Sequence, residues 1–128
     1  MKICVSAVSG SLDAQVDQRF GRCQYFVIVD SETMKFEVIE NDSKNTSSGA
    51  GIQAAQTIAN HGTEIVITGN VGPNAFQVLS TAGIRIITGA YGSVEETIER
   101  YKRGELKETS SPTVGGHSGM GRGRSWRR

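Results

Sequence analysis

Residues 64–76, EIVITGNVGPNAF, change from a strand pattern to a helix pattern within a few positions. The first five residues, EIVIT, form a short apolar run that is typical of a buried strand. Pro73 stands where a helix would begin, a position at which its missing N–H costs nothing. Phe76 and Leu79 then share one helical face, and Gly83 ends the pattern. This stretch predicts a strand followed by a helix, which is the building unit of α/β proteins.

The same unit recurs on both sides of this stretch. A helix pattern starts near Ala50 and stops at Gly62, just before the strand described above. Downstream, residues 84–88 predict another buried strand. A third helix follows, capped by Ser93 and closed by Gly104. The second half of the chain therefore predicts alternating helices and strands, whose strands run parallel.

The first 40 residues contain three strand patterns and no helix pattern. Residues 2–8, 25–30 and 35–40 are the predicted strands, and the short link between the second and third indicates an antiparallel hairpin. The predicted order is β-β-β-α-β-α-β-α, which indicates one mixed five-stranded sheet with helices packed on it. Right-handed crossovers make the last two strands parallel to the first.

Most of the unusual residues fall in loops that this topology brings to one edge of the sheet. Open α/β sheets bind ligands at that edge. Helix N-termini carry partial positive charge, glycines allow a close approach, and arginines add full charge, so we expect a site for a bulky anion. All three helix N-termini are expected to contribute. The candidate binding residues are Ser9, Arg19, Phe20, Gly21, Arg22, Cys23, Asn45, Gly49, Gly51, Gly69, Asn70, Gly72, Asn74, Gly89 and Gly92.

The two cysteines and two histidines are the candidate metal ligands. Two cysteines are too few for a disulfide framework and lack the C-x-x-C spacing. Cys4 lies in the middle of a strand and is expected in the core. Cys23 adjoins Arg22, which would favour a thiolate ligand, although packing in the core is an equal alternative. His61 suits a helix C-terminus, whereas His117, flanked by small residues near the chain end, is a second candidate metal ligand.

Charge is unevenly distributed along the 128 residues. The total is +1, but residues 107–128 hold five cations and one glutamate, a net +4, which leaves −3 for residues 1–106. The composition of 107–128, rich in Gly, Ser and Arg, predicts a flexible tail after a domain that spans 1–106. Four arginines and one tryptophan would give only weak, salt-sensitive contact with nucleic acid, so no specific nucleic-acid partner is expected. No apolar run approaches membrane-spanning length, and we expect a cytoplasmic protein with reduced thiols and no membrane partner.

Several short motifs resemble one known family, that of the dinitrogenase iron–molybdenum cofactor biosynthesis proteins. They are Asp17…Arg19-Phe20-Gly21-x-Cys23-x-x-Phe26, Gly49-Ala50-Gly51, Gly69-Asn70-x-Gly72-Pro73-Asn74-Ala75-Phe76 and Gly89…Gly92. The resemblance implies a ribonuclease-H-like fold. It also implies binding of an iron–sulfur or iron–molybdenum-type cluster or its precursor, in the role of a carrier that exchanges this cargo with donor and acceptor proteins. The chain would act as a monomer or weak homodimer.

Two other functions compete with the carrier. A nuclease on this fold needs several carboxylates on its strands to bind two magnesium ions. Strand 2–8 has none, and strand 64–68 has only Glu64 at its wrong end, so no enzymatic activity is expected. A module that binds a phosphorylated metabolite or nucleotide at the same glycine-rich edge remains the alternative, although neither G-x-x-x-x-G-K-[ST] nor G-x-G-x-x-G occurs in the expected place. Visible colour would separate a metal–sulfur cluster from a nucleotide.

Overall fold

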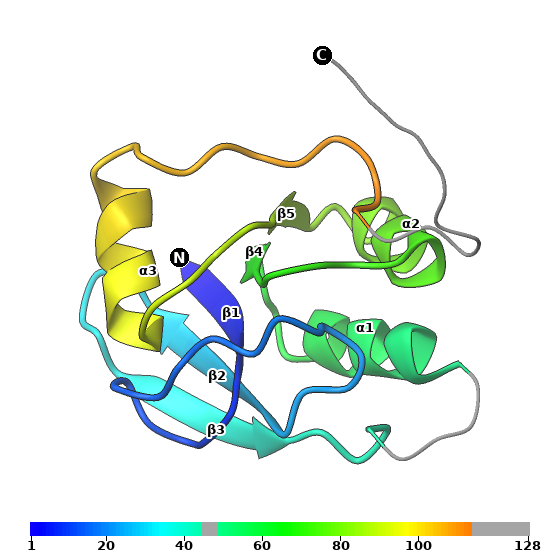
Figure 1. The fold of residues 1–128 in the computed structure, drawn as a ribbon, viewed down its shortest axis with the longest axis horizontal. Coiled ribbons are helices and arrows are strands. Elements are labelled where there is room, and N and C mark those ends of the chain that lie inside the picture. The colour runs from blue at the N-terminus through cyan, green and yellow to red at the C-terminus, as the bar shows by residue number, and fades with distance from the viewer. Residues whose placement is uncertain (45–48, 114–128) are drawn as a thin grey trace.

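The structure is a computed structural model that describes residues 1–44 and 49–113. Its elements are β1 (Lys2–Ala7), β2 (Tyr25–Asp30), β3 (Phe36–Glu40), α1 (Ala50–Asn60), β4 (Ile65–Ile67), α2 (Pro73–Thr81), β5 (Arg85–Ile87) and α3 (Val94–Lys102). Each lies within two residues of its predicted place (Figure 1). No helix in the described ranges has the length and apolar character needed to cross a bilayer.

The five strands form one mixed sheet in the order β3-β2-β1-β4-β5. β1 pairs antiparallel with β2, and β2 pairs antiparallel with β3. β4 pairs parallel with β1 on one side and with β5 on the other. Val5 in the central strand lies opposite Val27 of β2 and Ile67 of β4. The predicted mixed five-stranded sheet is confirmed, and its classification as ribonuclease-H-like stays a prediction.

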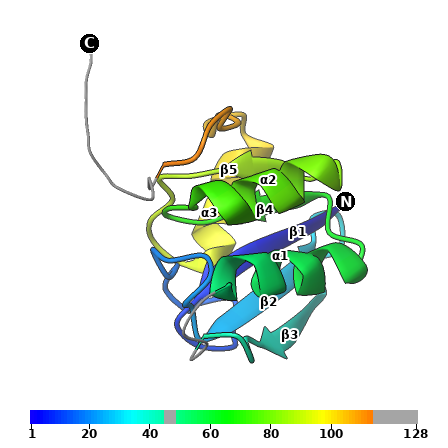
Figure 2. The ribbon, with the colours of Figure 1, turned by 90° about the vertical axis from the view of Figure 1, so that its right-hand side faces the viewer.

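The helices cover both faces of the sheet. Figure 2 shows α1 and α2 on the near side and α3 on the far side. Alternation along β1 explains the two cores, because successive side chains of a strand point to opposite faces. Cys4 packs with the residues of α1 and α2, whereas Ile3 and Val5 pack with those of α3. β1, β2 and β4 are buried on both sides, which explains their nearly continuous apolar sequences. The edge strand β3 is mostly exposed and contains both apolar and acidic residues.

The chain continues past α3 along the open edge of the sheet. Figure 1 shows this segment, coloured orange, running from the end of α3 past β5 towards α2. Leu106 packs against the core on the α3 side. The backbone N–H of Thr109 donates to the carbonyl of Ile86 at 2.6 Å, and Thr113 hydrogen-bonds with Val71. Residues 107–113, expected from composition to belong to a flexible tail, are thus hydrogen-bonded to the domain, because an edge strand offers backbone groups that need partners.

Candidate functional site

A groove lies where residues 18–22 face the starts of α1 and α2. It consists of two adjoining hollows, each of about 270 Å3, which share Phe20, Gly21, Asn70 and Gly72. Its lining residues are Gln18, Arg19, Phe20, Gly21, Arg22, Gly49, Ala50, Gly51, Ile52, Asn70, Gly72, Pro73, Asn74 and Ala75. No carboxylate and no histidine is among these residues, so the groove presents backbone N–H groups, amides and guanidinium groups.

The N-termini of α1 and α2 both open into this groove. Their N-cap residues are Gly49 and Gly72, and no side chain from the described residues caps either helix. The first intrahelical bonds are accepted by the carbonyls of these two glycines. The N–H groups that come before those bonds have no partner inside the helix and carry partial positive charge. Neither first turn contains an acidic residue that would offset this positive charge.

Glycines bring the loop and the two helix starts into close contact. A Cβ on Gly21 would lie 2.9 Å from both the Cα and the N of Gly51. A Cβ on Gly51 would in turn lie 3.2 Å from the Cβ of Ala75 in α2. Real Cβ atoms do not approach backbone as closely as the first of these distances, so Gly21 cannot be replaced without moving the loop or the start of α1. The width of the groove depends on this contact.

Two guanidinium groups stand at the groove, and one of them has a buried counter-charge. Arg19 lies 3.3 Å from Asp17 through its Nε, and the Asp17 side chain is only 8% exposed. Asp17 also accepts a hydrogen bond from the backbone N–H of Arg19, at 2.9 Å. Arg22 donates to the carbonyl of Lys44 at 2.8 Å and is exposed. The formal charge of these three side chains is therefore +1, and the helix N-termini supply the rest of the positive potential.

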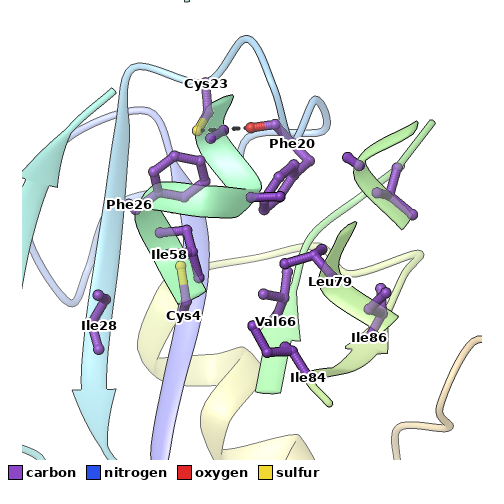
Figure 3. Packing of buried hydrophobic residues seen from close by; sticks show 14 residues of the cluster. Cys4, Phe20, Cys23, Phe26, Ile28, Ile58, Val66, Leu79, Ile84 and Ile86 are labelled. Carbon is purple, nitrogen blue, oxygen red and sulfur yellow. Dashed lines mark hydrogen bonds between the residues drawn. The ribbon is translucent and has the colours of Figure 1, made fainter. Parts of the chain in front are cut away.

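Cys23 lies beneath the groove and does not line it. Its side chain is fully buried, and its thiol donates to the carbonyl of Phe20 at 3.3 Å (Figure 3). Burial, aided by the nearby negative charge of Asp17, raises the pKa of Cys23 to about 12. This direction is opposite to the one expected from the neighbouring arginines, and burial of the thiol is its largest cause. The geometry favours the packing alternative, and metal ligation by Cys23 stays a prediction.

Cys4 is buried in the same core cluster as Cys23, as predicted. Burial raises the pKa of its thiol well above the ordinary range. Within the residues that the structure describes, no three His, Cys, Asp or Glu side chains come together as they would around a metal ion. His61 is held at the end of α1, where its Nδ1 lies 2.8 Å from the carbonyl of Thr57. The described part of the chain thus holds no preassembled group of three metal-ligating side chains.

Most of the sequence-predicted binding residues meet in the groove. Those that line it are Arg19, Phe20, Gly21, Arg22, Gly49, Gly51, Asn70, Gly72 and Asn74. Ser9, Gly69, Gly89 and Gly92 are not among the lining residues. Ser9 is exposed in the loop after β1, and Gly69 packs against Gln18. Gly89 donates its N–H to the carbonyl of Gly69. Asn45 and His117 lie outside the described residues.

The expectation that three helix N-termini converge is wrong for α3. This helix packs on the opposite face of the sheet from α1 and α2. Its N-terminus is closed by its own side chains: Ser93 Oγ accepts from the N–H of Glu96, and Glu96 Oε1 accepts from the N–H of Ser93. Glu95 adds a second negative charge in the first turn. A helix start that is already capped and acidic does not attract an anion.

Five lining residues were missing from the predicted set: Gln18, Ala50, Ile52, Pro73 and Ala75. Four of them belong to the first turns of α1 and α2. A simple rule would have found these four, because the residues directly after an N-cap form the first turn at the positive end of a helix. Pro73 lies in that turn although it has no N–H of its own. No sequence motif indicated Gln18 as a binding residue. It lines the groove because of the path that its loop takes.

Comparisons with known proteins identify the family of this chain. Residues 1–104 match the family model described as dinitrogenase iron-molybdenum cofactor. An uncharacterised protein of Methanocaldococcus jannaschii is 34% identical over 97 residues, which cover 73% of this chain and 82% of that protein. The apo form of the orange protein from Desulfovibrio gigas has a TM-score of 0.86 at 40% identity, covering 88% of this chain and 95% of that one. A NifB-type protein from Thermotoga has a TM-score of 0.75 at 33% identity, covering 88% and 97%. The chain therefore belongs to the dinitrogenase iron-molybdenum cofactor family.

Proposed function

We propose that this protein binds and carries an anionic metal–sulfur cluster, of the iron–sulfur or iron–molybdenum type, or a precursor of it. The observation that carries the proposal is the groove into which two helix N-termini open. Among the described residues, no side chain caps either helix and no carboxylate lines the groove. Such clusters are bulky anions, and converging N–H groups are a general solution for binding anions. The chain belongs to a family described by the iron–molybdenum cofactor, and this membership suggests the class of cargo.

The cargo would be held by hydrogen bonds and charge rather than by thiolates. Sulfide and oxo groups at the surface of a cluster accept hydrogen bonds from backbone N–H groups, as thiolate sulfurs do in iron–sulfur proteins. The first turns of α1 and α2 supply these donors, and Arg22 adds a full charge. Both described cysteines are buried, and burial raises the pKa of each. A protonated, buried thiol is a poor metal ligand.

A carrier needs reversible binding and no catalytic group. The lining residues in the described part of the chain hold no side chain that exchanges protons near neutral pH. This supports a binding role, in which proteins that make and use the cluster act as donor and acceptor. The two free cysteines suit a reducing compartment such as the cytoplasm.

Anaerobic loading with a coloured probe tests the proposal. The full chain is mixed with tetrathiomolybdate, a simple soluble anion of molybdenum and sulfur, or reconstituted with iron and sulfide. Visible absorption and metal content are then measured after gel filtration. We expect a coloured protein with close to stoichiometric metal. A colourless protein that instead binds inorganic phosphate or a nucleotide would support the metabolite-binding alternative and overturn the cluster proposal.

Replacing Cys23 by alanine separates packing from ligation. We expect Cys23→Ala to bind tetrathiomolybdate with the affinity of the unchanged protein, because the thiol lies beneath the groove and is protonated. The small cavity should lower the free energy of unfolding by about 1 kcal/mol. Absorbance titration and urea denaturation measure the two quantities. A variant that folds normally but loses the probe would show that Cys23 is a ligand after all.

A further inference from the structure

Two buried polar side chains lie in the turn after β3, next to the groove. They belong to Asn41 and Ser43, which are 3% and 6% exposed. The carbonyls that they contact belong to the loop around Gly21 and to the start of α1, the two segments that approach each other at the groove. Among the described residues, no backbone hydrogen bond joins these two segments directly. The two side chains make that connection instead.

The amide of Asn41 uses all of its hydrogen-bonding capacity. Its Nδ2 donates to the carbonyl of Gly21 at 3.1 Å and to the carbonyl of Cys23 at 2.9 Å. Its Oδ1 accepts from the backbone N–H of Ser43 at 3.2 Å and from the hydroxyl of Ser43 at 2.7 Å. An amide group has two N–H donors and one oxygen with two lone pairs, so no group is left over. Asn41 therefore fixes the loop around Gly21 relative to the turn after β3.

The hydroxyl of Ser43 continues this connection to α1. It lies 2.7 Å from Oδ1 of Asn41 and 3.2 Å from the carbonyl of Ala50, so that its one proton is shared between two acceptors. Ala50 is the first residue of α1 and lines the groove, as Gly21 does. Hydrogen bonds thus run from one side of the groove, through Asn41 and Ser43, to the other side.

The same turn also holds the guanidinium group of Arg22. The backbone N–H of Lys44 donates to the carbonyl of Asn41 at 3.4 Å, which closes the turn. Arg22 donates through Nη1 to the carbonyl of Lys44 at 2.8 Å. Arg22 lines the groove, so the turn that begins at Asn41 places a full positive charge there as well.

We propose that Asn41 and Ser43 are positioning residues for anion binding, which hold the Gly21 loop and the start of α1 at the separation that the cargo needs. The inference rests on the proposed function. Neither residue is among those that line the groove, so both act through their neighbours. Buried hydrogen-bonded groups can be replaced by apolar groups at little cost in stability, so stability alone does not account for this network. A fully satisfied polar network makes the groups that it joins rigid, and a preorganised site loses less freedom on binding.

Replacing Ser43 by alanine breaks the connection at a single atom. Tetrathiomolybdate is titrated by absorbance against the full chain. We expect Ser43→Ala to weaken binding by about three- to tenfold, which corresponds to the loss of one hydrogen bond. Asn41→Ala removes the whole network and should weaken binding by at least as much. Circular dichroism and urea denaturation establish which variants are folded, and the Ser43 variants carry the test if Asn41→Ala does not fold.

Two controls separate positioning from a general loss of stability. Ser43→Thr keeps the hydroxyl, and its extra methyl has space because Ser43 also borders a separate hollow of about 320 Å3 between its turn and α1. This variant should bind within about twofold of the unchanged protein, since the hydrogen bond is kept. Thr97→Val removes a similarly buried hydroxyl, which donates to the carbonyl of Val94 in α3. It should leave binding unchanged, because α3 packs on the other face of the sheet.

Hydrogen exchange in the ligand-free protein tests the positioning without any cargo. The N–H of Gln53 makes the first hydrogen bond inside α1, and the N–H of Phe20 donates to the carbonyl of Asn70. We expect both N–H groups to exchange several-fold faster in Ser43→Ala, since local opening becomes easier where the network held the chain. The N–H of Thr97, which makes the corresponding first bond of α3, should exchange at an unchanged rate.

The outcomes distinguish this inference from the proposed function. If the unchanged chain binds the probe and Ser43→Ala binds it equally well, the positioning role is wrong and the proposed function stands. If Ser43→Thr or Thr97→Val loses as much affinity as Ser43→Ala, the hydrogen bond is not the cause and the inference is also wrong. If the unchanged chain binds no probe, the proposed function is overturned and the exchange rates decide alone. Unaltered rates at Gln53 and Phe20 would then overturn the positioning role too, and faster rates would support it.

Discussion

Gly21→Ala is expected to lower the affinity of the groove for tetrathiomolybdate by roughly 10- to 100-fold. The added Cβ would lie 2.9 Å from the backbone of Gly51, so the loop or the start of α1 has to move. Movement of that helix start misplaces the N–H groups that face the ligand. Losing one hydrogen bond to a charged group costs about 1.5–3 kcal/mol, and each 1.4 kcal/mol is about tenfold in affinity. Overpacking should also cost about 1–3 kcal/mol of folding stability.

Two further glycine variants serve as comparisons for this prediction. Gly83→Ala introduces strain, because Gly83 has a φ of 80°, but its Cβ would meet nothing within 4 Å. It should cost about 1 kcal/mol of stability and leave binding unchanged, since it follows α2 at the end away from the groove. In Gly51→Ala the added Cβ would lie 3.2 Å from the Cβ of Ala75, so its loss of affinity should fall between those of the other two variants. Absorbance titration and urea denaturation of each variant test the order, and equal binding by Gly21→Ala and the unchanged protein would contradict it.

Alkaline pH is expected to destabilise the fold through the buried thiols. Cys23 has an ordinary pKa of 9.0 when exposed and about 12 in the folded protein. Above pH 9 the unfolded chain loses this proton while the folded protein keeps it, so the free energy of unfolding falls as pH rises towards 12. Between pH 8 and pH 11 this amounts to about 2–3 kcal/mol from Cys23 alone. The buried thiol of Cys4, whose pKa is also raised, acts in the same direction.

The measurement compares two proteins, so that contributions to stability common to both cancel. Urea denaturation of the unchanged protein and of Cys23→Ala is compared at pH 8, 9.5 and 11. The alanine variant should be less stable at pH 8 and lose stability less steeply as pH rises. The difference in free energy of unfolding should shift by about 2–3 kcal/mol in its favour, so that it becomes the more stable of the two proteins at pH 11. Parallel curves would mean that the Cys23 thiol ionises in the folded state with an ordinary pKa, and the view of it as a packed core residue would fail.

The difference between α3 and the other two helices shows which features of the site the sequence could predict. All three helices begin after glycine-containing loops, and all three were expected to contribute their N-termini. The capping box of Ser93 and Glu96 is visible in the sequence and occurs in the structure. The box satisfies the N–H groups of Ser93 and Glu96, which could have been predicted. The N–H groups of Val94 and Glu95 donate to the carbonyls of Ala14 and Leu12, and only the fold shows these contacts. That α3 packs on the opposite face of the sheet became clear only from the fold.

The sequence by itself determined the order of strands and helices, the directions of the strands and the loops that meet at the sheet edge. These follow from local patterns, since periodicity, capping residues and crossover handedness act within a few dozen residues. Only the tertiary structure decided three other features: the burial of Cys23, the choice of two helix N-termini, and the attachment of residues 107–113 to β5 and Val71. The direction of a loop side chain and the partner of an edge strand depend on contacts between residues far apart in the sequence. No local pattern contains that information.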